Sequence, residues 1–589
     1  MIIIVESKEF IHSGIGIARY LKDQGVKYIF GIPDGLTMGL YRGIKETEGI
    51  THVLLNDERN CAFAADAYGR ITGTVGVCAA GPAGGLSFPI GLAEARGSSS
   101  PVLALVGLLR PKKWLRNFPH EIDAAGVLSP VTKWTEKIID PINLPRFLRF
   151  AFQQALSGKP GPVALVISEE VVNNTELKIK TFSSQQSKKN SIDDFRISPI
   201  REDIDTIADL IMNAKQPAIF CGEGSVISKA YDEVATLAQL LKAPVFSTIS
   251  GKGIMVSKDN PIDNLYFGLI GLFGQKPNHA FMRRKVDLLI AVGNRLTEDD
   301  TAFFKFPSRN TKMIQIGTEI SDMGLSYNPT VITGDPKATL NEVILNLKSK
   351  GFSLDSNELE IRLQNLNKLN NNLERYREND CKRWLNVEPI KPERVLQAIS
   401  DNLDENDYFV TDASASSRYT GAYFPVKGVG RRVITPRGIG PTGFGVGALI
   451  GTCFAVKTIA SEEKIPKKVL LTGDGSLMDG GLSEFETIVK LGLDCTIIVL
   501  NNKALGYIKF AQAFIFDREY FETDRPDTSF SQIAELFGGK GYRVEKLSDL
   551  DSTINEAINN KGFSLVEVMT DPEEFLPPSH YHHEWDYFV

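Results

Sequence analysis

The sequence lacks the cysteine and histidine arrangements that mark disulfide-rich proteins and zinc sites. Its six cysteines are scattered without a Cys-x-x-Cys pair, and its seven histidines form no His-Glu-x-x-His motif. Several of the cysteines fall within apolar runs, which is typical of buried thiols in a reducing compartment. We therefore expect a cytoplasmic protein without a disulfide framework or a zinc centre.

Long hydrophobic runs and an excess of positive charge are also missing. No apolar run approaches the ~20 residues that span a membrane. The opening residues, MIIIVESKE, turn charged after a short apolar run, which does not match a secretory signal. The net charge is −6, whereas nucleic-acid-binding domains are usually basic. The composition predicts a soluble globular protein with neither a membrane nor a nucleic acid as its partner.

What the chain does contain is a regular alternation of apolar strands and amphipathic helices. Its 589 residues are enough for three or four domains. Gly-rich loops follow many of the strands, which predicts an α/β protein with doubly wound, mostly parallel sheets. A polar linker over 182–194 and a Leu-rich helical stretch over 357–378 separate the parts. The expected segments are an N-terminal domain over 1–180, a central domain over 195–350, a C-terminal domain over 386–575 and a tail over 576–589.

The clearest candidate site lies where two expected strands of the C-terminal domain end. One strand leads into Gly473-Asp474-Gly475 and the next, over 493–500, ends at Asn501-Asn502. Such ends meet at one edge of a parallel sheet, where ligands bind. A carboxylate and an amide supply the hard oxygen ligands that Mg²⁺ shares with phosphates, and Gly475 and Ser476 offer N–H groups at a helix start. The plain alternative is a turn followed by an Asn pair.

The combination of Gly-Asp-Gly with Asn-Asn resembles the signature of thiamine-diphosphate enzymes of the acetolactate synthase, pyruvate oxidase and pyruvate decarboxylase superfamily. The resemblance covers nearly the whole chain, and the overall layout is nearest to the acetolactate synthase large subunit. It implies thiamine diphosphate as cofactor, with Mg²⁺ held by Asp474, Asn502 and the backbone carbonyl of Ala504. The further cofactor contacts that it implies in these two loops are Gly473, Gly475, Ser476, Asn502, Leu505 and Gly506.

A second candidate lies in the first third of the chain. On position alone, Glu58 is a first-turn carboxylate that interacts favourably with the helix dipole. The segment from Asn56 to Arg70 also resembles the family segment whose Glu faces N1′ of the cofactor's aminopyrimidine. The resemblance implies that Glu58 shares a proton with that nitrogen, with a pKa raised by desolvation. It further implies cofactor contacts from Pro33 and from Gly81, which opens Gly81-Pro-Ala-Gly-Gly.

Two more loops of the C-terminal third match the family. Ser414, Ala415 and Ser416 resemble its first diphosphate contact, and an ordinary Ser-rich helix cap is the alternative. Gly440 would offer its carbonyl to the 4′-amino group of the cofactor. Thr442 stands where the family has a bulky apolar residue between the two cofactor rings.

His120 is a candidate of a different kind, because its loop departs from the family pattern. Relatives of acetolactate synthase tend to read Phe-Gln-Glu where this chain has Phe118-Pro119-His120-Glu121. A His here could take up or release a proton near neutral pH. A loop His with one surface hydrogen bond is an equally good interpretation.

The central domain leaves FAD open. Its Gly222-Glu-Gly-Ser turn resembles the family's central domain, which holds FAD in acetolactate synthase and pyruvate oxidase. The usual Ile-Asp after the last strand is replaced by Ile316-Gly317. The sequence slightly favours a vestigial nucleotide fold that supports the other domains.

The resemblance implies decarboxylation of a pyruvate-like 2-oxoacid followed by carboligation. It also implies a homodimer or homotetramer with active sites at the subunit interface. The tail is aromatic and His-rich, and from this composition we expect it to close over the site as a lid or to pack on a neighbouring subunit. Ala511 and the stretch Ser168-Glu169-Glu170 replace a Trp and a Lys usual in acetolactate synthases. A decarboxylase, a pyruvate oxidase and a 2-hydroxyacyl-CoA lyase therefore stay open. A non-catalytic scaffold or regulator is the alternative of another class, which the intact Glu58, Asp474 and Asn502 disfavour.

Overall fold

The computed structural model describes residues 10–182, 190–308, 310–460 and 465–574. The tail, with its predicted packing, lies outside these residues. Contacts divide the chain into two compact units. The first unit comprises Met1–Phe195, Pro436–Ile465 and Asp479–Leu493, and the second unit comprises Arg196–Thr435, Pro466–Met478 and Asp494–Val589.

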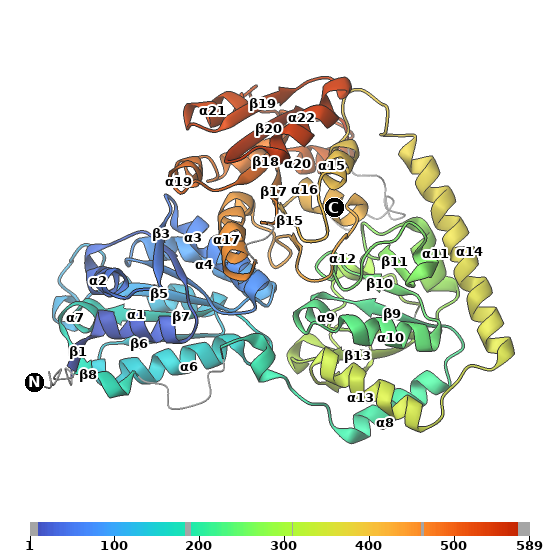
Figure 1. The fold of residues 1–589 in the computed structure, drawn as a ribbon, viewed down its shortest axis with the longest axis horizontal. Helices are drawn as coiled ribbons and strands as arrows, with labels where there is room; N and C mark the ends of the chain where they lie inside the picture. The colour runs from blue at the N-terminus through green and yellow to red at the C-terminus, as the bar shows by residue number, and fades with distance from the viewer. Residues whose placement is uncertain (1–9, 183–189, 309, 461–464, 575–589) are drawn as a thin grey trace, which may run out of the picture. The chain divides into compact units, whose positions relative to one another are not determined.

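Three six-stranded parallel sheets form the framework, which confirms the predicted α/β class. Each sheet is built from about one third of the chain, as the colours in Figure 1 show. A small antiparallel pair, β1 (Phe10–His12) with β8 (Glu176–Lys178), accompanies the first sheet. No helix in the described part of the chain combines the length and the apolar character needed to cross a membrane.

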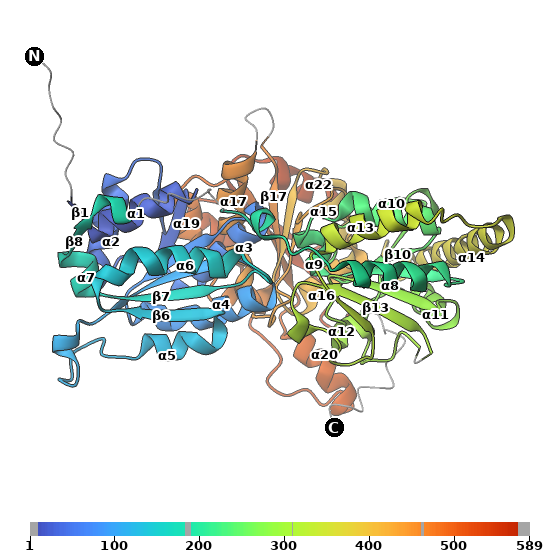
Figure 2. The ribbon, with the colours of Figure 1, turned by 90° about the horizontal axis from the view of Figure 1, so that it is seen from below.

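The first sheet has helices on both faces, as a doubly wound fold requires. Its strands in spatial order are β3 (Thr51–Leu54), β2 (Tyr28–Gly31), β4 (Gly76–Ala80), β5 (Val102–Leu108), β7 (Val163–Ser168) and β6 (Trp134–Ile138). Its helices are α1 (Ser13–Asp23), α2 (Met38–Glu46), α3 (Glu58–Thr72), α4 (Phe88–Gly97), α5 (Ala124–Leu128), α6 (Leu144–Leu156) and α7 (Glu169–Asn174). Apolar side chains of α1, α2 and α6 share one core with Val77, Leu103 and Leu165 of the strands. Figure 2 shows α5 on the opposite side of β6 and β7 from α6.

Two helices from the last third of the chain complete the first unit. They are α17 (Phe444–Ile459) and α19 (Glu484–Lys490). Helix α17 packs closely along α3, because glycines of α17 face α3. A Cβ atom on Gly451 would lie 2.1 Å from the carbonyl oxygen of Ala64.

The central sheet belongs to the second unit and has the strand order of dinucleotide-binding folds. Its strands in spatial order are β11 (Tyr266–Leu269), β10 (Val245–Ser247), β9 (Pro217–Cys221), β12 (Leu288–Val292), β13 (Lys312–Gly317) and β14 (Thr330–Thr333). Its helices are α8 (Arg201–Met212), α9 (Glu223–Ile227), α10 (Tyr231–Leu241), α11 (Lys276–Arg284), α12 (Glu298–Thr301) and α13 (Pro336–Ser349). The long helix α14 (Ser356–Cys381) then follows, over the stretch predicted as a helical connector.

The third sheet repeats the strand order of the first. In spatial order it consists of β16 (Val433–Ile434), β15 (Tyr408–Thr411), β17 (Lys468–Gly473), β18 (Cys495–Asn501), β20 (Phe563–Met569) and β19 (Lys540–Val544). The helices of the second unit in this part are α15 (Pro392–Asp401), α16 (Ala415–Tyr423), α18 (Asp474–Met478), α20 (Gly506–Ile515), α21 (Phe530–Leu536) and α22 (Leu547–Asn559). In the first sheet β2 pairs with β3 and β4, and in the third sheet β15 pairs with β16 and β17. The carboxyl ends of these strands therefore have equivalent positions in the two sheets.

Candidate functional site

The predicted metal ligands lie at neighbouring strand ends in the second unit. Strands β17 and β18 pair in parallel, with Gly473 opposite Leu500. Asp474 follows β17 as the first residue of α18, and Asn502 follows β18 directly. The Gly475 N–H donates to Oδ1 of Asp474 at 2.8 Å, and the Ala504 N–H donates to Oδ1 of Asn502 at 3.1 Å. The structure thus places both side chains on the same edge of the third sheet.

The environment of Asp474 fits a bound cation. Burial raises the pKa of its carboxyl to about 6, and the Gly475 N–H and the charge of Arg525 offset this only in part. A divalent ion would offset the cost of an ionised carboxylate at this depth. The described residues contain no cluster of three or more His, Cys, Asp and Glu side chains suited to a metal. An ion held here would therefore depend on amide and carbonyl oxygens, which Mg²⁺ accepts.

The loop after Asn502 is shaped by backbone constraints. Lys503 has a φ of 53°, which turns the chain between Asn502 and Ala504. The N–H of Leu505 donates to the Thr523 carbonyl at 2.7 Å and fixes the loop against a distant segment. A Cβ on Gly506 would lie 2.6 Å from Nδ2 of Asn502, so any larger residue at this position would displace the Asn502 amide.

The predicted diphosphate loop lies at the same edge of the third sheet. Residues 412–414 link β15 to α16, and β15 pairs with β17. Ser414 has φ 64° and ψ −138°, a conformation that costs a non-glycine residue about 1–3 kcal/mol. Such strain persists where the surrounding structure enforces it, and it is concentrated at ligand sites. Ser416 is buried, while Ser414 and Ala415 are half-buried.

The first unit brings three other predicted loops together. Glu58 begins α3 behind Asp57, whose Oδ1 accepts the Arg59 N–H at 2.8 Å. A Cβ on Gly84 would lie 2.3 Å from Oε1 of Glu58, so this half-buried carboxyl rests on the Gly-rich loop after β4. In the same way, Gly81 abuts the carboxyl of Asp34, the neighbour of Pro33. The loops after β2, β3 and β4 thus meet at one edge of the first sheet.

Two acidic residues that the sequence analysis did not single out organise the surroundings of Glu58. The buried Glu484 accepts the N–H groups of Asn56 and Asp57, both at 3.0 Å. Asp479 accepts from the Thr442 hydroxyl at 2.6 Å and from Arg59 Nη1 at 3.1 Å. The sequence could have pointed to Glu484, because it is a charged residue within an apolar helical stripe and a buried charge needs partners.

Glu94 holds the turn that contains Gly440. Its two carboxylate oxygens accept the N–H groups of Gly438, Ile439 and Gly440 at 2.8–3.1 Å. Glu94 also pairs with Arg70 at 2.9 Å. Burial opposes ionisation, yet the Arg70 guanidinium and the backbone N–H groups hold the pKa of Glu94 below its usual range. Nothing in the sequence around Glu94 indicated this role.

His120 stands apart from these groups. Its side chain is exposed, and its backbone has a φ of 67°. The loop is held by Glu121, which accepts the N–H groups of Leu115 and of Phe118. Within the described ranges His120 has no hydrogen-bond partner, so nothing orients it toward the other candidates.

The Gly-rich turn of the central domain is closed by its own backbone. The N–H of Gly222 donates to Val292 O, and the N–H of Gly224 donates to Gly293 O, both at 2.9 Å. A Cβ on Gly222 would lie 2.4 Å from Gly293 O. Close packing of the two loops therefore accounts for these glycines, and the N–H groups of Gly222 and Gly224 are not available to a diphosphate.

Comparison with known proteins identifies the family of the chain. Three family models match the chain: the N-terminal TPP binding domain of thiamine pyrophosphate enzymes over 13–127, their central domain over 204–343 and their C-terminal TPP binding domain over 412–568. A probable acetolactate synthase large subunit of Methanococcus aeolicus is 29% identical, over 95% of this chain and 92% of that protein. The acetolactate synthase isozyme 1 large subunit of Escherichia coli K12 is 28% identical, over 95% of this chain and 94% of that protein. The chain belongs to the thiamine pyrophosphate enzymes and acts on carbon–carbon bonds.

Proposed function

We propose that this enzyme uses thiamine diphosphate and Mg²⁺ to decarboxylate a pyruvate-like 2-oxoacid and to join the remaining fragment to a second carbonyl compound. The observation that carries the proposal is the position of Asp474 and Asn502 at adjacent strand ends, in a chain that matches all three thiamine pyrophosphate domains. The acetolactate synthase relatives, which align along nearly the whole chain, supply the reaction type.

In this proposal each loop has one task. Asp474, Asn502 and the Ala504 carbonyl hold Mg²⁺, and the loop over Ser414–Ser416 contacts the diphosphate. When bound, the cofactor accepts the electrons released as carbon dioxide leaves the substrate. Glu58 exchanges a proton with the pyrimidine nitrogen N1′, and Glu484 fixes the backbone that presents Glu58.

The assignment of Glu58 is tested by Glu58→Gln, which keeps the shape but removes the exchangeable proton. We expect carbon dioxide release to fall by about 10²-fold or more, while cofactor binding is retained. The control is Glu46→Gln, which makes the same change at an exposed carboxylate of the same domain and should keep full activity. Unchanged release in Glu58→Gln would refute the assignment.

Product analysis tests the reaction. The purified protein is incubated with Mg²⁺, thiamine diphosphate and a panel of 2-oxoacids, and its visible spectrum is recorded. We expect acetolactate from pyruvate and no flavin absorbance. An aldehyde with carbon dioxide as the only products would indicate a decarboxylase, and flavin-dependent oxidation would indicate an oxidase. No turnover of any 2-oxoacid would favour an acyl-CoA lyase or a scaffold.

We also propose a homodimer or homotetramer in which Glu58 of one chain completes the site built on Asp474 and Asn502 of another. The support is the resemblance to the superfamily, in which the two half-sites come from different subunits. All six cysteines are free thiols, which is consistent with a cytoplasmic location.

A further inference from the structure

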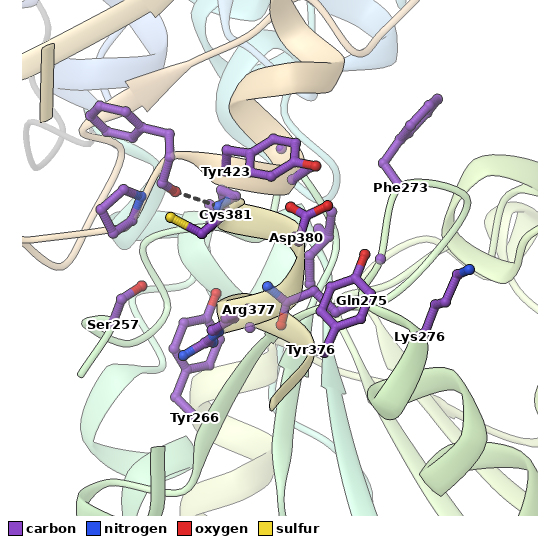
Figure 3. A pocket seen from close by; sticks show the side chains of 18 of the residues that line it. Ser257, Tyr266, Phe273, Gln275, Lys276, Tyr376, Arg377, Asp380, Cys381 and Tyr423 are labelled. Carbon is purple, nitrogen blue, oxygen red and sulfur yellow. Dashed lines mark hydrogen bonds between the residues drawn. The ribbon is translucent and has the colours of Figure 1, made fainter. Parts of the chain in front are cut away.

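The second unit contains a cavity of about 570 Å³ that belongs to none of the loops described above. It lies between the central sheet, helix α14 and the end of α16. Figure 3 shows Tyr376, Arg377, Asp380 and Cys381 on α14, with Ser257 and Tyr266 coming from the central domain. No residue assigned here to the cofactor or the metal lines this cavity.

Two cationic side chains that are not exposed, the buried Lys252 and the half-buried Arg377, line the cavity without an ion-pair partner among the described residues. Lys252 is 8% exposed, and its Nζ donates to the Phe424 carbonyl at 2.7 Å. Burial lowers the pKa of Lys252 to about 7, and the charge of Arg377 adds to this effect. Burial also lowers the pKa of Arg377. A desolvated cation is costly without an anion nearby.

The acidic residues of the lining do not fill this role. The Asp380 carboxylate accepts from Trp384 Nε1 at 3.3 Å and lies 3.6 Å from Arg383, so it already has partners. Asp259 and Glu378 are exposed. The charges of Glu374 and Asp259 act on Arg377 only from beyond ion-pair distance.

Aromatic residues form part of the remaining wall. Tyr266, Phe273, Tyr376, Trp384 and Tyr423 line the cavity. Its volume is in the range of small-molecule sites, which combine apolar walls with a few polar groups that fix orientation. The lining thus combines planar surfaces with two basic groups, Lys252 and Arg377, that have no ion-pair partner among the described residues.

We propose that this cavity is a binding site for a small organic anion. The carboxylate or phosphate of the ligand pairs with Lys252 and Arg377, and a planar apolar body packs against the aromatic walls. This site is separate from the one proposed for the 2-oxoacid. The binding proposal therefore does not depend on the reaction proposed above.

The test is a calorimetric titration of the full-length protein saturated with thiamine diphosphate and Mg²⁺, so that the cofactor loops are occupied. The probes are phenyl phosphate and benzoate, with neutral benzyl alcohol for comparison. We expect one molecule of at least one anion to bind per chain, and benzyl alcohol to bind at least tenfold more weakly. A preference between the two anions tells phosphate from carboxylate. Failure of both anions to bind at millimolar concentration would overturn the proposal.

Variants of α14 locate the binding. Arg377→Gln should weaken anion binding by about tenfold or more, because a charge-assisted contact is lost. Arg375→Gln removes an exposed charge two residues away and should leave binding unchanged. Equal binding by the wild type and a folded Arg377→Gln would place the anion elsewhere and refute the proposal.

The wild-type protein offers a readout that needs no variant. Cys381 lines the cavity and is half-buried, whereas the other five cysteines are buried. The bound anion should slow alkylation of Cys381 by iodoacetamide, as followed by peptide mass spectrometry. An alkylation rate of Cys381 that is insensitive to a saturating anion would contradict binding at this place.

Discussion

Buried carboxylates act on the backbone of the candidate site. Glu94 and Glu484 are both 0% exposed, and each accepts N–H groups from a loop that carries a proposed cofactor residue. Carboxylate bonds to N–H groups are about twice as strong as neutral ones. These two residues therefore fix the loops that Glu58 and Gly440 belong to.

Glu94→Gln should loosen the turn at Gly440. Gln keeps one accepting oxygen, but its NH₂ group replaces the other oxygen and cannot accept from the backbone N–H groups that it faces. We expect the dissociation constant of thiamine diphosphate to rise about tenfold, measured by fluorescence titration. Ser98→Ala is the matched control, since it removes a 2.8 Å bond to the same carboxylate and spares the turn. Cofactor affinities that are equal in the two variants would show that Glu94 serves stability alone.

Lys252 gives a prediction about pH. Its folded pKa, about 7, lies below the unfolded value of 10.5, so between these values the unfolded chain holds a proton that the folded chain lacks. Its contribution to the free energy of unfolding therefore rises with pH across this window. Compared with Lys252→Met, the wild type should gain on the order of 2 kcal/mol between about pH 6 and pH 9. Urea unfolding measures this difference. The other charged or titratable groups that line the cavity are Lys258, Asp259, Tyr266, Lys276, Tyr376, Arg377, Glu378, Asp380, Cys381 and Tyr423. A difference that does not change with pH would mean that Lys252 stays charged in the fold.

At the level of elements, the sequence patterns predict the positions of strands better than the points at which helices begin and end. The apolar runs Pro217–Cys221 and Leu288–Val292 are strands with those same bounds, because fully buried parallel strands have no polar face to blur their ends. The helix predicted to start at Gly475 and Ser476 is the short α18, and Gly480 at a φ of 85° separates it from a second helix, α19. The contact of Glu94 with Gly440 could not be predicted, because periodicity carries no information about partners far apart in sequence.

The packing of α17 on α3 leads to a prediction about stability. Gly451→Ala should lower the free energy of unfolding by roughly 1–3 kcal/mol, since the new methyl group would collide with the Ala64 carbonyl. Gly35→Ala is the control, because a Cβ there meets no atom within 4 Å. Urea denaturation followed by circular dichroism compares them. Equal midpoints would mean that the two helices separate at no cost.

On the scale of the whole molecule, the framework consists of three parallel sheets, and sequence alternation was enough to predict this class. The proposed functional residues fall on the first and the third sheets, whose strand orders are the same. The sequence could not show that the Gly-rich turn of the central domain is closed by hydrogen bonds, because these depend on the approach of β9 to β12.

Complementation between two inactive variants tests the shared site. Glu58→Gln and Asp474→Ala should each be inactive alone. After mixing, dissociation and reassociation, about one quarter of wild-type activity should return, because half of the dimers are mixed and each of these has one intact site. A mixture of Glu58→Gln with Glu58→Gln,Asp474→Ala is the control and should stay inactive. No recovery in the first mixture would mean that each chain builds its site alone.

The strand directions have a practical consequence for handling the protein. The Glu58 loop, Gly81 and the Asp474, Asn502 and Ser414 loops all follow the carboxyl ends of parallel strands. The opposite rims of the first and third sheets are therefore where a reporter peptide or a fusion partner can be inserted with the least disturbance to turnover.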